Sequence, residues 1–221
     1  MKTRFLLIVV LLAAFLSACQ PPAAPTFTGT WTANVGLVTL TQNGDQVTGS
    51  VDGYGGYWNF TVAGTVSGSF LIFAGDTPLG PLAIALSEDG NTFQSMDPTL
   101  AFCGTRDAVL PDGCGFSGTW NLKTDLVPAG GYAKLTQTGA SVTGAVYGSN
   151  DAELVPLNAM VSWGKGWQAE GTNNWGDFTL NMTSDEKAFE LSTGEQFGQE
   201  WCGLREGETS AYVFYFDCAI P

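Results

Sequence analysis

Histidine is absent from all 221 residues of this chain. The most usual general base near neutral pH is therefore missing, and neither a Ser-His nor a Cys-His nucleophile can be assembled. Charged residues make up only 13% of the chain, against a usual fraction of about 25%. No stretch keeps the apolar spacing i, i+3, i+4, i+7 over about three turns, so no long amphipathic helix is predicted. These absences argue against most enzyme classes and against a helical fold.

Paired carboxylates are one catalytic device that the composition still permits, since glycoside hydrolysis needs only two of them. The candidates for such a pair are Glu170, Asp177, Glu190 and Glu195. Asp89, Asp185 and Glu186 lie in predicted hairpin turns, where acids usually form local turn hydrogen bonds. We expect a protein that is not an enzyme and that needs no cofactor, with a carboxylate hydrolase as the alternative.

Basic residues are few, at 8 against 21 acidic residues, so the net charge is −13. Removal of residues 1–18, which contain Lys2 and Arg4 but no acid, leaves 6 basic residues and a net charge of −15. Such a surface repels nucleic acid and anionic lipid head groups. We therefore expect no nucleic-acid partner.

The chain begins with Lys2 and Arg4, followed by an apolar run from Phe5 to Phe15. This run is shorter than the roughly 20 residues of a spanning helix and is typical of a secretory signal. It ends in Leu16-Ser17-Ala18-Cys19, which resembles the lipobox of bacterial lipoproteins. The resemblance implies a signal peptide over 1–18, a diacylglycerol on the Cys19 sulfur and fatty acylation, such as palmitate, of the new amino terminus.

A lipid on Cys19 would be followed by a short Pro-rich tether, so that residues 19–26 join the lipid to the first domain. We expect the protein on the exported side of a bacterial cell envelope, in the outer membrane if the organism has one. The membrane would then be a partner through the N-terminal lipid. The alternative is an ordinary signal peptide whose cleavage site happens to precede a cysteine.

An internal repeat organises the remainder of the chain. Three shared phrases occur in the same order in each copy: Phe27-Thr28-Gly29-Thr30-Trp31 and Phe116-Ser117-Gly118-Thr119-Trp120, then Leu40-Thr41-Gln42 and Leu135-Thr136-Gln137, then Cys103-Gly104-Thr105-Arg106 and Cys202-Gly203-Leu204-Arg205. The offset grows from 89 to 99 residues, which indicates small insertions at Thr124–Ala129 and near Gly194–Glu200. We predict two homologous domains, 27–114 and 115–221.

Four cysteines remain once Cys19 is assigned to the lipid, and exported chains retain disulfides. Four cysteines allow three pairings. The repeat favours the pairing in which each disulfide joins two cysteines of the same copy. We predict the disulfides Cys103–Cys114 and Cys202–Cys218. A zinc site is disfavoured because the chain lacks both histidine and a Cys-x-x-Cys spacing, so no metal is expected.

Both repeats consist of short alternating apolar runs separated by turn residues. Val38, Leu40 and Gln42 share one face of a predicted strand, and Asn43-Gly44 is typical of a tight hairpin turn. Regularly spaced runs of this kind predict an all-β fold with an antiparallel meander in each repeat, either a sandwich or a barrel. We expect two tandem antiparallel up-and-down meander barrels. One large barrel shared by both repeats is the alternative. Tyr212–Phe216 is predicted to form one closing strand, pinned by the Cys202–Cys218 disulfide.

The shared phrases resemble the strand pattern of avidin-like and lipocalin-like meander barrels. The resemblance implies barrels that are open at one end and hold a small apolar or amphipathic molecule. It also implies that the early Trp packs across the closed end beneath a late Arg. The counterparts in this chain are Trp31 with Arg106 and Trp120 with Arg205.

Gln42 and Gln137 each end an apolar strand face. Each amide could belong to an internal polar network, to a solvated strand end or to a ligand site. Aromatic residues provide further candidates for ligand contacts, because Trp and Tyr beside amides can stack on sugars. These are Tyr54, Trp58, Trp163, Trp167 and Trp175, with core packing as the alternative role.

These observations predict a lipid-anchored, non-enzymatic binding module for a small apolar molecule or a glycan. The alternative is a structural or protein-interaction lipoprotein with filled barrels, including a protease-inhibitor-like protein. The sequence identifies no protein partner.

Overall fold

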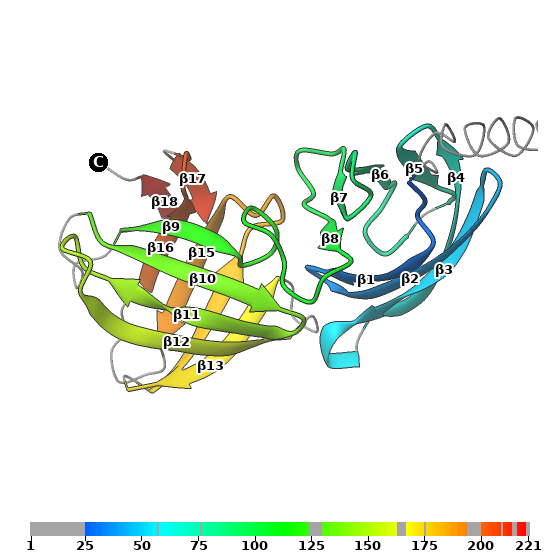
Figure 1. Cartoon of the computed structure of the whole chain (residues 1–221). Helices are drawn as coiled ribbons and strands as arrows, with labels where there is room; N and C mark the ends of the chain where they lie inside the picture. The colour runs from blue at the N-terminus through cyan, green and yellow to red at the C-terminus, as the bar shows by residue number, and fades with distance from the viewer. Residues whose placement is uncertain are drawn as a thin grey trace, which may run out of the picture.

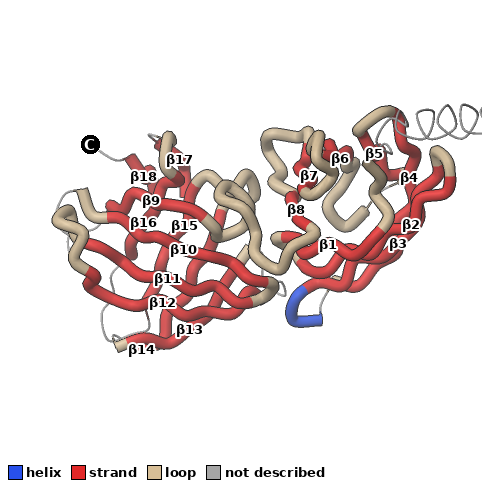
Figure 2. Tube along the Cα trace, viewed as in Figure 1, coloured by secondary structure: helices blue, strands red, loops and turns tan. Residues whose placement is uncertain are grey.

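The computed structural model describes residues 25–56, 58–75, 77–123, 130–162, 167–174, 176–193, 200–208, 210–213 and 216–219. These residues form two closed eight-stranded antiparallel barrels, one after the other along the chain (Figure 1). Strands dominate both barrels, and the one short helical turn lies at Tyr54–Gly56 (Figure 2). Among the described residues, no helix has the length and apolar character needed to cross a bilayer. The two-barrel prediction is confirmed, and one shared barrel is excluded.

Barrel 1 comprises β1 Gly29–Ala33, β2 Gly36–Asn43, β3 Gln46–Gly53, the 3₁₀ turn η1 Tyr54–Gly56, β4 Asn59–Ser67, β5 Phe70–Phe73, β6 Ala83–Leu86, β7 Thr92–Ser95 and β8 Cys103–Thr105. Barrel 2 comprises β9 Gly118–Lys123, β10 Tyr132–Thr138, β11 Ser141–Tyr147, β12 Glu153–Ser162, β13 Gln168–Asn173, β14 Gly176–Met182, β15 Ala188–Thr193 and β16 Glu200–Arg205. β1 pairs with β8 to close the first barrel, and β9 pairs with β16 to close the second.

The alternating sequence pattern determines which side chains fill each barrel. In β2, Val38 and Leu40 are buried while Thr39 and Thr41 are exposed. The register continues into β3 through the Asn43-Gly44 hairpin, where Gly44 has φ +60°. A strand places successive side chains on opposite faces, so period-2 alternation brings the apolar half of every strand into one interior.

The two disulfides join the predicted partners, Cys103 to Cys114 and Cys202 to Cys218. The prediction of one closing strand over Tyr212–Phe216 is wrong. A separate hairpin, β17 Ser210–Val213 and β18 Phe216–Ala219, occupies this region beside β15 and β16 (Figure 1). High β-propensity identified the extended backbone but not its division into two paired strands. The second disulfide attaches this hairpin to β16.

An arginine laid on a tryptophan closes the same end of each barrel. The Arg106 Cζ atom lies 4.0 Å from the Trp31 ring centroid, and the Arg205 Cζ atom lies 4.2 Å from that of Trp120. Both indoles are fully buried. Each indole Nε1–H donates at 3.0 Å to the carbonyl four residues earlier, of Phe27 in barrel 1 and of Phe116 in barrel 2.

Each arginine also donates three hydrogen bonds to backbone carbonyls. Arg106 binds the carbonyls of Thr26, Thr28 and Gly90. Arg205 binds those of Gly115, Ser117 and Glu186. The last strand of each barrel is thereby tied both to the segment before the first strand and to the hairpin turn between the sixth and seventh strands.

The repeated Cys-Gly-x-Arg phrase now has a structural reason at each position. The cysteine forms the disulfide, and the arginine covers the tryptophan. The glycine lets an aromatic ring pack on the backbone, because a Cβ on Gly104 would lie 2.6 Å from the Phe93 ring and one on Gly203 would lie 2.5 Å from the Phe189 ring. Those two rings in turn make edge contacts with Trp31 and Trp120.

The barrels meet at a polar junction. The turn after β1 and the loop before β8 in barrel 1 contact the turns of barrel 2. Ala101 N–H donates to the Ser184 carbonyl at 2.8 Å, and Gln137 Nε2 donates to the Asn34 carbonyl at 3.3 Å. The loop that joins the barrels adds Leu110 N–H, which donates to the Gln137 carbonyl at 2.9 Å. The closed end of barrel 2 is therefore covered by barrel 1.

Replacing Arg106 by lysine is expected to lower the stability of the protein by about 3 kcal/mol. Lysine keeps the positive charge but cannot stack a planar group on the Trp31 ring or donate to all three backbone carbonyls. Each of these two interactions contributes about 1 kcal/mol or more. Urea denaturation monitored by fluorescence provides the measurement. Lys123→Arg, at an exposed strand end, is the matched control and should change stability by less than about 0.5 kcal/mol. An unchanged midpoint for Arg106→Lys would contradict the closing role of this side chain.

Candidate functional site

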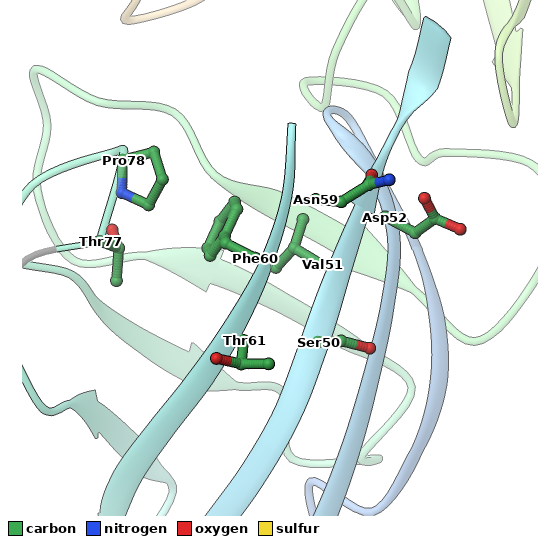
Figure 3. A pocket seen from close by; sticks show the side chains of 8 residues that line it. All are labelled: Ser50, Val51, Asp52, Asn59, Phe60, Thr61, Thr77 and Pro78. Carbon is green, nitrogen blue, oxygen red and sulfur yellow. The ribbon is translucent and has the colours of Figure 1, made fainter. Parts of the chain in front are cut away.

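A surface depression of about 700 Å³ lies at the end of barrel 1 that carries the β3–β4 and β5–β6 connections. Eight residues line it: Ser50, Val51, Asp52, Asn59, Phe60, Thr61, Thr77 and Pro78. Val51 and Phe60 lie on the side that faces Thr77 and Pro78, while Asn59 and Asp52 lie on the other side of their strands (Figure 3). The depression therefore combines an apolar side and a polar rim.

The depression exists because β4 and β5 separate near the open end of the barrel. β4 pairs with β3 from Asn59 onward, but it pairs with β5 only from Gly64 to Ser67. The last contact before the separation is the Ala74 N–H, which donates to the Ala63 carbonyl at 2.7 Å. Beyond it, the β5–β6 connection faces the first half of β4, with Thr77 and Pro78 across from Phe60.

Local hydrogen bonds shape both sides of this opening. Thr77 Oγ1 donates to the Gly80 carbonyl at 2.8 Å and accepts from Leu79 N–H at 3.1 Å, which holds a tight turn. On the opposite rim, the Asn59 amide in its hydrogen-bonded orientation donates to Asp52 Oδ1 at 2.8 Å. A preformed rim of this kind lowers the ordering entropy that a ligand must overcome.

The two glutamines of the repeat lie at the closed ends of their barrels, and neither lines the depression. Gln42 Oε1 accepts from Phe27 N–H at 3.0 Å, and its Nε2 donates to the Gly44 carbonyl at 3.0 Å. Gln137 repeats both bonds, with Phe116 N–H at 3.0 Å and the Gly139 carbonyl at 3.1 Å. Gln42 is half-buried at a strand end, whereas Gln137 is fully buried in an internal network. Both amides thus serve as turn and strand braces.

The aromatic candidates occupy different surroundings. Trp58 is partly buried against the core and precedes the rim residue Asn59. Tyr54 belongs to η1, which contacts β12 of barrel 2, and its hydroxyl oxygen lies near Gly139 at the junction. Burial raises the pKa of the Tyr54 phenol to about 12, so it stays neutral.

Of the tryptophan group expected in barrel 2, Trp167 is the member within the described residues. Trp167 is partly buried against the core, just before β13. Ser162 pairs with Gln168 at this end of β13, whereas Asn173 pairs with Gly176 at the other end. Trp163 and Trp175 themselves lie outside the described residues, and so does Cys19.

Three of the four carboxylates considered for a hydrolase pair lie within the described residues, and these three point outward from barrel 2. Glu170 and Asp177 are exposed and Glu190 is half-exposed on the outer wall, while Glu195 lies outside the described residues. Asp177 Oδ1 accepts from Thr172 Oγ1 at 2.7 Å. Asp89 and Asp185 each accept hydrogen bonds within their own hairpin turns, as expected.

Glu186 is the polar residue whose role sequence reasoning missed. It is 1% exposed and lies at the junction of the two barrels. Its Oε1 accepts from Asn34 Nδ2 of barrel 1 at 2.6 Å, and its Oε2 accepts from Gly115 N–H at 2.7 Å. The repeat did contain a signal, because Glu186 aligns with Gly90, and both residues adopt positive φ, +56° and +71°.

Burial raises the pKa of the Glu186 carboxyl to about 7, against the opposing effects of the Asn34 hydrogen bond, the Arg205 charge and the Gly115 N–H. Asp185 adds a smaller upward effect. The same burial lowers the pKa of Arg205. The junction therefore contains a carboxyl that changes charge near neutral pH.

No model of a known protein family matches this chain, and no curated protein shows significant similarity to it.

The free energy of unfolding is expected to fall by up to about 3 kcal/mol because of Glu186 as pH rises from about 4.5 to about 7. The native state holds this proton to a higher pH than the unfolded chain does. The contribution of Glu186 to the free energy of unfolding is therefore complete below its pKa in the unfolded chain and is lost above its pKa in the native state.

Urea denaturation of the wild type and of Glu186→Gln at intervals from pH 4.5 to 8 measures this contribution, since other carboxyls cancel in the difference. The difference in stability should change across this window. Parallel pH profiles for the two proteins would show that Glu186 does not titrate in it.

Proposed function

We propose that this protein is a lipid-anchored, non-enzymatic binding protein of the bacterial cell envelope that holds a glycan at the mouth of barrel 1. The observation that carries the proposal is the depression of about 700 Å³ between β4 and the β5–β6 connection. Its volume falls within the range of about 300–1,000 Å³ that is usual for small-molecule sites.

The chemistry of the lining favours a sugar over a purely apolar molecule. Five of the eight lining residues carry a hydroxyl, an amide or a carboxylate: Thr77 on the side of Phe60, and Ser50, Asp52, Asn59 and Thr61 at the rim, on the outer face of β3 and β4. These groups can donate to and accept from sugar hydroxyls. Phe60 offers an aromatic surface on which the C–H face of a sugar ring can pack.

Charge narrows the class of glycan further. The chain carries a net charge of −13, and Asp52 lies on the rim of the depression. An acidic glycan would be repelled, whereas a neutral or amino sugar would not. The proposed ligand is therefore an uncharged or cationic oligosaccharide of a few rings.

The proposal places the protein on the exported side of the envelope through Cys19. The lipobox-like sequence and the two disulfides support this location, because disulfides persist in exported compartments. Two kinds of acyl attachment would give stable anchoring, whereas a single chain is marginal.

A structural or protein-interaction lipoprotein is the second candidate, and the filled closed end of barrel 1 favours it. Phe93 packs against Trp31 and Phe102 with ring centroids 5.4 and 5.1 Å apart. A ligand at the mouth therefore cannot descend to the closed end. Under this alternative, the depression would be a surface feature without a ligand.

Phe60→Ala is expected to weaken glycan binding by about tenfold, because it removes the stacking surface. Oligosaccharides would be selected on an array of neutral and amino sugars with the chain that begins at Gln20. Native mass spectrometry and titration calorimetry would then measure the affinity. Phe70→Ala is the matched control, since Phe70 is 40% exposed on the outer wall. Binding of no sugar on the array, or equal losses in both variants, would reject the glycan site.

Cys19→Ala is expected to move the protein from the membrane fraction to the soluble exported fraction, because the variant cannot receive the thioether lipid. Fractionation of cells followed by immunoblotting provides the measurement. Retention of Cys19→Ala in the membrane fraction would contradict anchoring through this residue.

A further inference from the structure

An uncharged apolar wall covers the outside of barrel 1 over β5, β6 and the end of β7. Ile72 pairs with Ala83, and Met96 N–H donates to the Ala83 carbonyl at 2.9 Å, so these three residues form one row across the strands. Phe70 pairs with Ala85 in the adjacent row. Ile72, Met96 and Phe70 are 55%, 54% and 40% exposed.

The neighbouring strands extend this wall without adding charge. Thr65 pairs with Ile72 and Ser67 pairs with Phe70 on the β4 side. Gln94 pairs with Ala85 on the β7 side. These two rows of outward side chains cross the four strands β4 to β7, and they contain no acidic or basic side chain.

Barrel 2 shows that the fold does not require such a wall. Leu71 pairs with Ile84 inside barrel 1, and the equivalent inward pair of barrel 2 is Ala169 with Leu180. Counting one residue along each strand from these pairs gives the equivalent outward positions of the two barrels. The residues at those positions are Gln168 for Phe70, Glu170 for Ile72, Thr179 for Ala83, Asn181 for Ala85, Glu190 for Gln94 and Ser192 for Met96. The matching strands in the described part of barrel 2 thus carry polar and acidic side chains, so these strands do not need an apolar outer wall to fold.

The first described residues place the start of the chain beside these strands. Pro25 packs against Gly90 in the β6–β7 hairpin, and the Thr26 carbonyl accepts from Arg106 at 2.6 Å. Cys19 precedes Pro25 by six residues, which span at most about 20 Å when extended. A lipid on Cys19 would therefore keep the β6–β7 end of barrel 1 close to the bilayer.

We infer that the wall formed by Phe70, Ile72, Ala83, Ala85 and Met96 lies against the lipid surface when the chain is anchored. The inference rests on the lipid anchor of the proposed function. Five partly exposed side chains cover roughly a few hundred Å², whereas a stable protein interface buries about 800 Å² on each partner. The wall is therefore too small to hold a second copy by itself. A tethered contact needs much less, because the anchor supplies a high local concentration.

Electrostatic repulsion also favours this uncharged wall as the face that contacts the lipid surface. Most of the surface of this acidic protein is repelled by anionic head groups, and repulsion between charges is weakest where a protein face carries none. An uncharged face with three exposed apolar side chains can approach the interface and bury them there. Contact through this wall would set the orientation of barrel 1 on the membrane.

Photo-crosslinking of the lipidated full chain in its own membrane tests the inference. Ile72→benzoylphenylalanine places a probe in the wall, and Glu170→benzoylphenylalanine places the same probe at the matching position of barrel 2. The expected result is at least fivefold more lipid adduct from position 72. A second variant carries the probe at Phe70 together with Ile72→Glu, the residue that barrel 2 tolerates at this position. Its lipid adduct should fall at least fivefold relative to the probe at Phe70 alone.

Equal lipid adducts at positions 72 and 170 would overturn the inference. Predominant protein adducts at position 72 would also overturn it and would indicate a second copy or another protein. A chain that does not fractionate with the membrane would overturn it as well, because the wall is argued to act beside an anchored chain end. None of these outcomes bears on glycan binding, which is measured with the released chain.

Discussion

The stack of an arginine on a buried tryptophan is the interaction on which each barrel depends. It joins three parts of the chain that are distant in sequence: the segment before the first strand, the turn between the sixth and seventh strands, and the end of the last strand. A short meander barrel buries little apolar area per residue, so its closure needs specific contacts in addition to alternation. The arginine guanidinium supplies these specific contacts, because its N–H groups donate to three backbone carbonyls while its planar face covers the indole ring. The repeated phrases of the sequence are the residues that this one arrangement requires.

The second copy of this closed end has been modified to receive the first barrel. Where barrel 1 has Gly90, barrel 2 has Glu186, which keeps the positive φ of the turn. A non-glycine residue in this conformation is costly by about 1 kcal/mol or more, and so is a buried carboxyl without partners. Asn34 and Gly115 N–H satisfy both carboxyl oxygens, and Arg205 lies close enough to oppose the effect of burial on the pKa. Buried polar contacts of this kind require one particular arrangement of two barrels, whereas apolar contact alone would permit several.

The sequence predicted the features that the repeat carries twice and missed those that only one copy carries. The two domains and both disulfides follow from phrases that occur in matching order, and both Arg–Trp pairs follow from the resemblance of those phrases to avidin-like and lipocalin-like barrels. The β17–β18 hairpin was misread because aromatic and β-branched residues favour extended backbone without locating a turn. Glu186 was interpreted as a local turn acid because a single hairpin gives no sign of what covers it. The depression was not predictable either, since it depends on where β4 and β5 separate, and β4 alternates in the same way on either side of Gly64.

The differences between the two barrels indicate which of them carries the surfaces proposed to contact lipid and ligand. Duplication supplies two barrels with the same closed end, and each free surface can then change without disturbing the interior, because period-2 alternation separates inward from outward positions. Barrel 1 has acquired an uncharged wall and an open mouth, while barrel 2 carries acidic side chains such as Glu170 on the matching strands. Barrel 1 also follows the lipobox-like segment directly. The surfaces assigned to lipid and ligand therefore belong to the barrel nearest the proposed anchor. Barrel 2 contacts barrel 1 at the Asn34 turn, which lies at the same barrel end as the β3–β4 and β5–β6 connections.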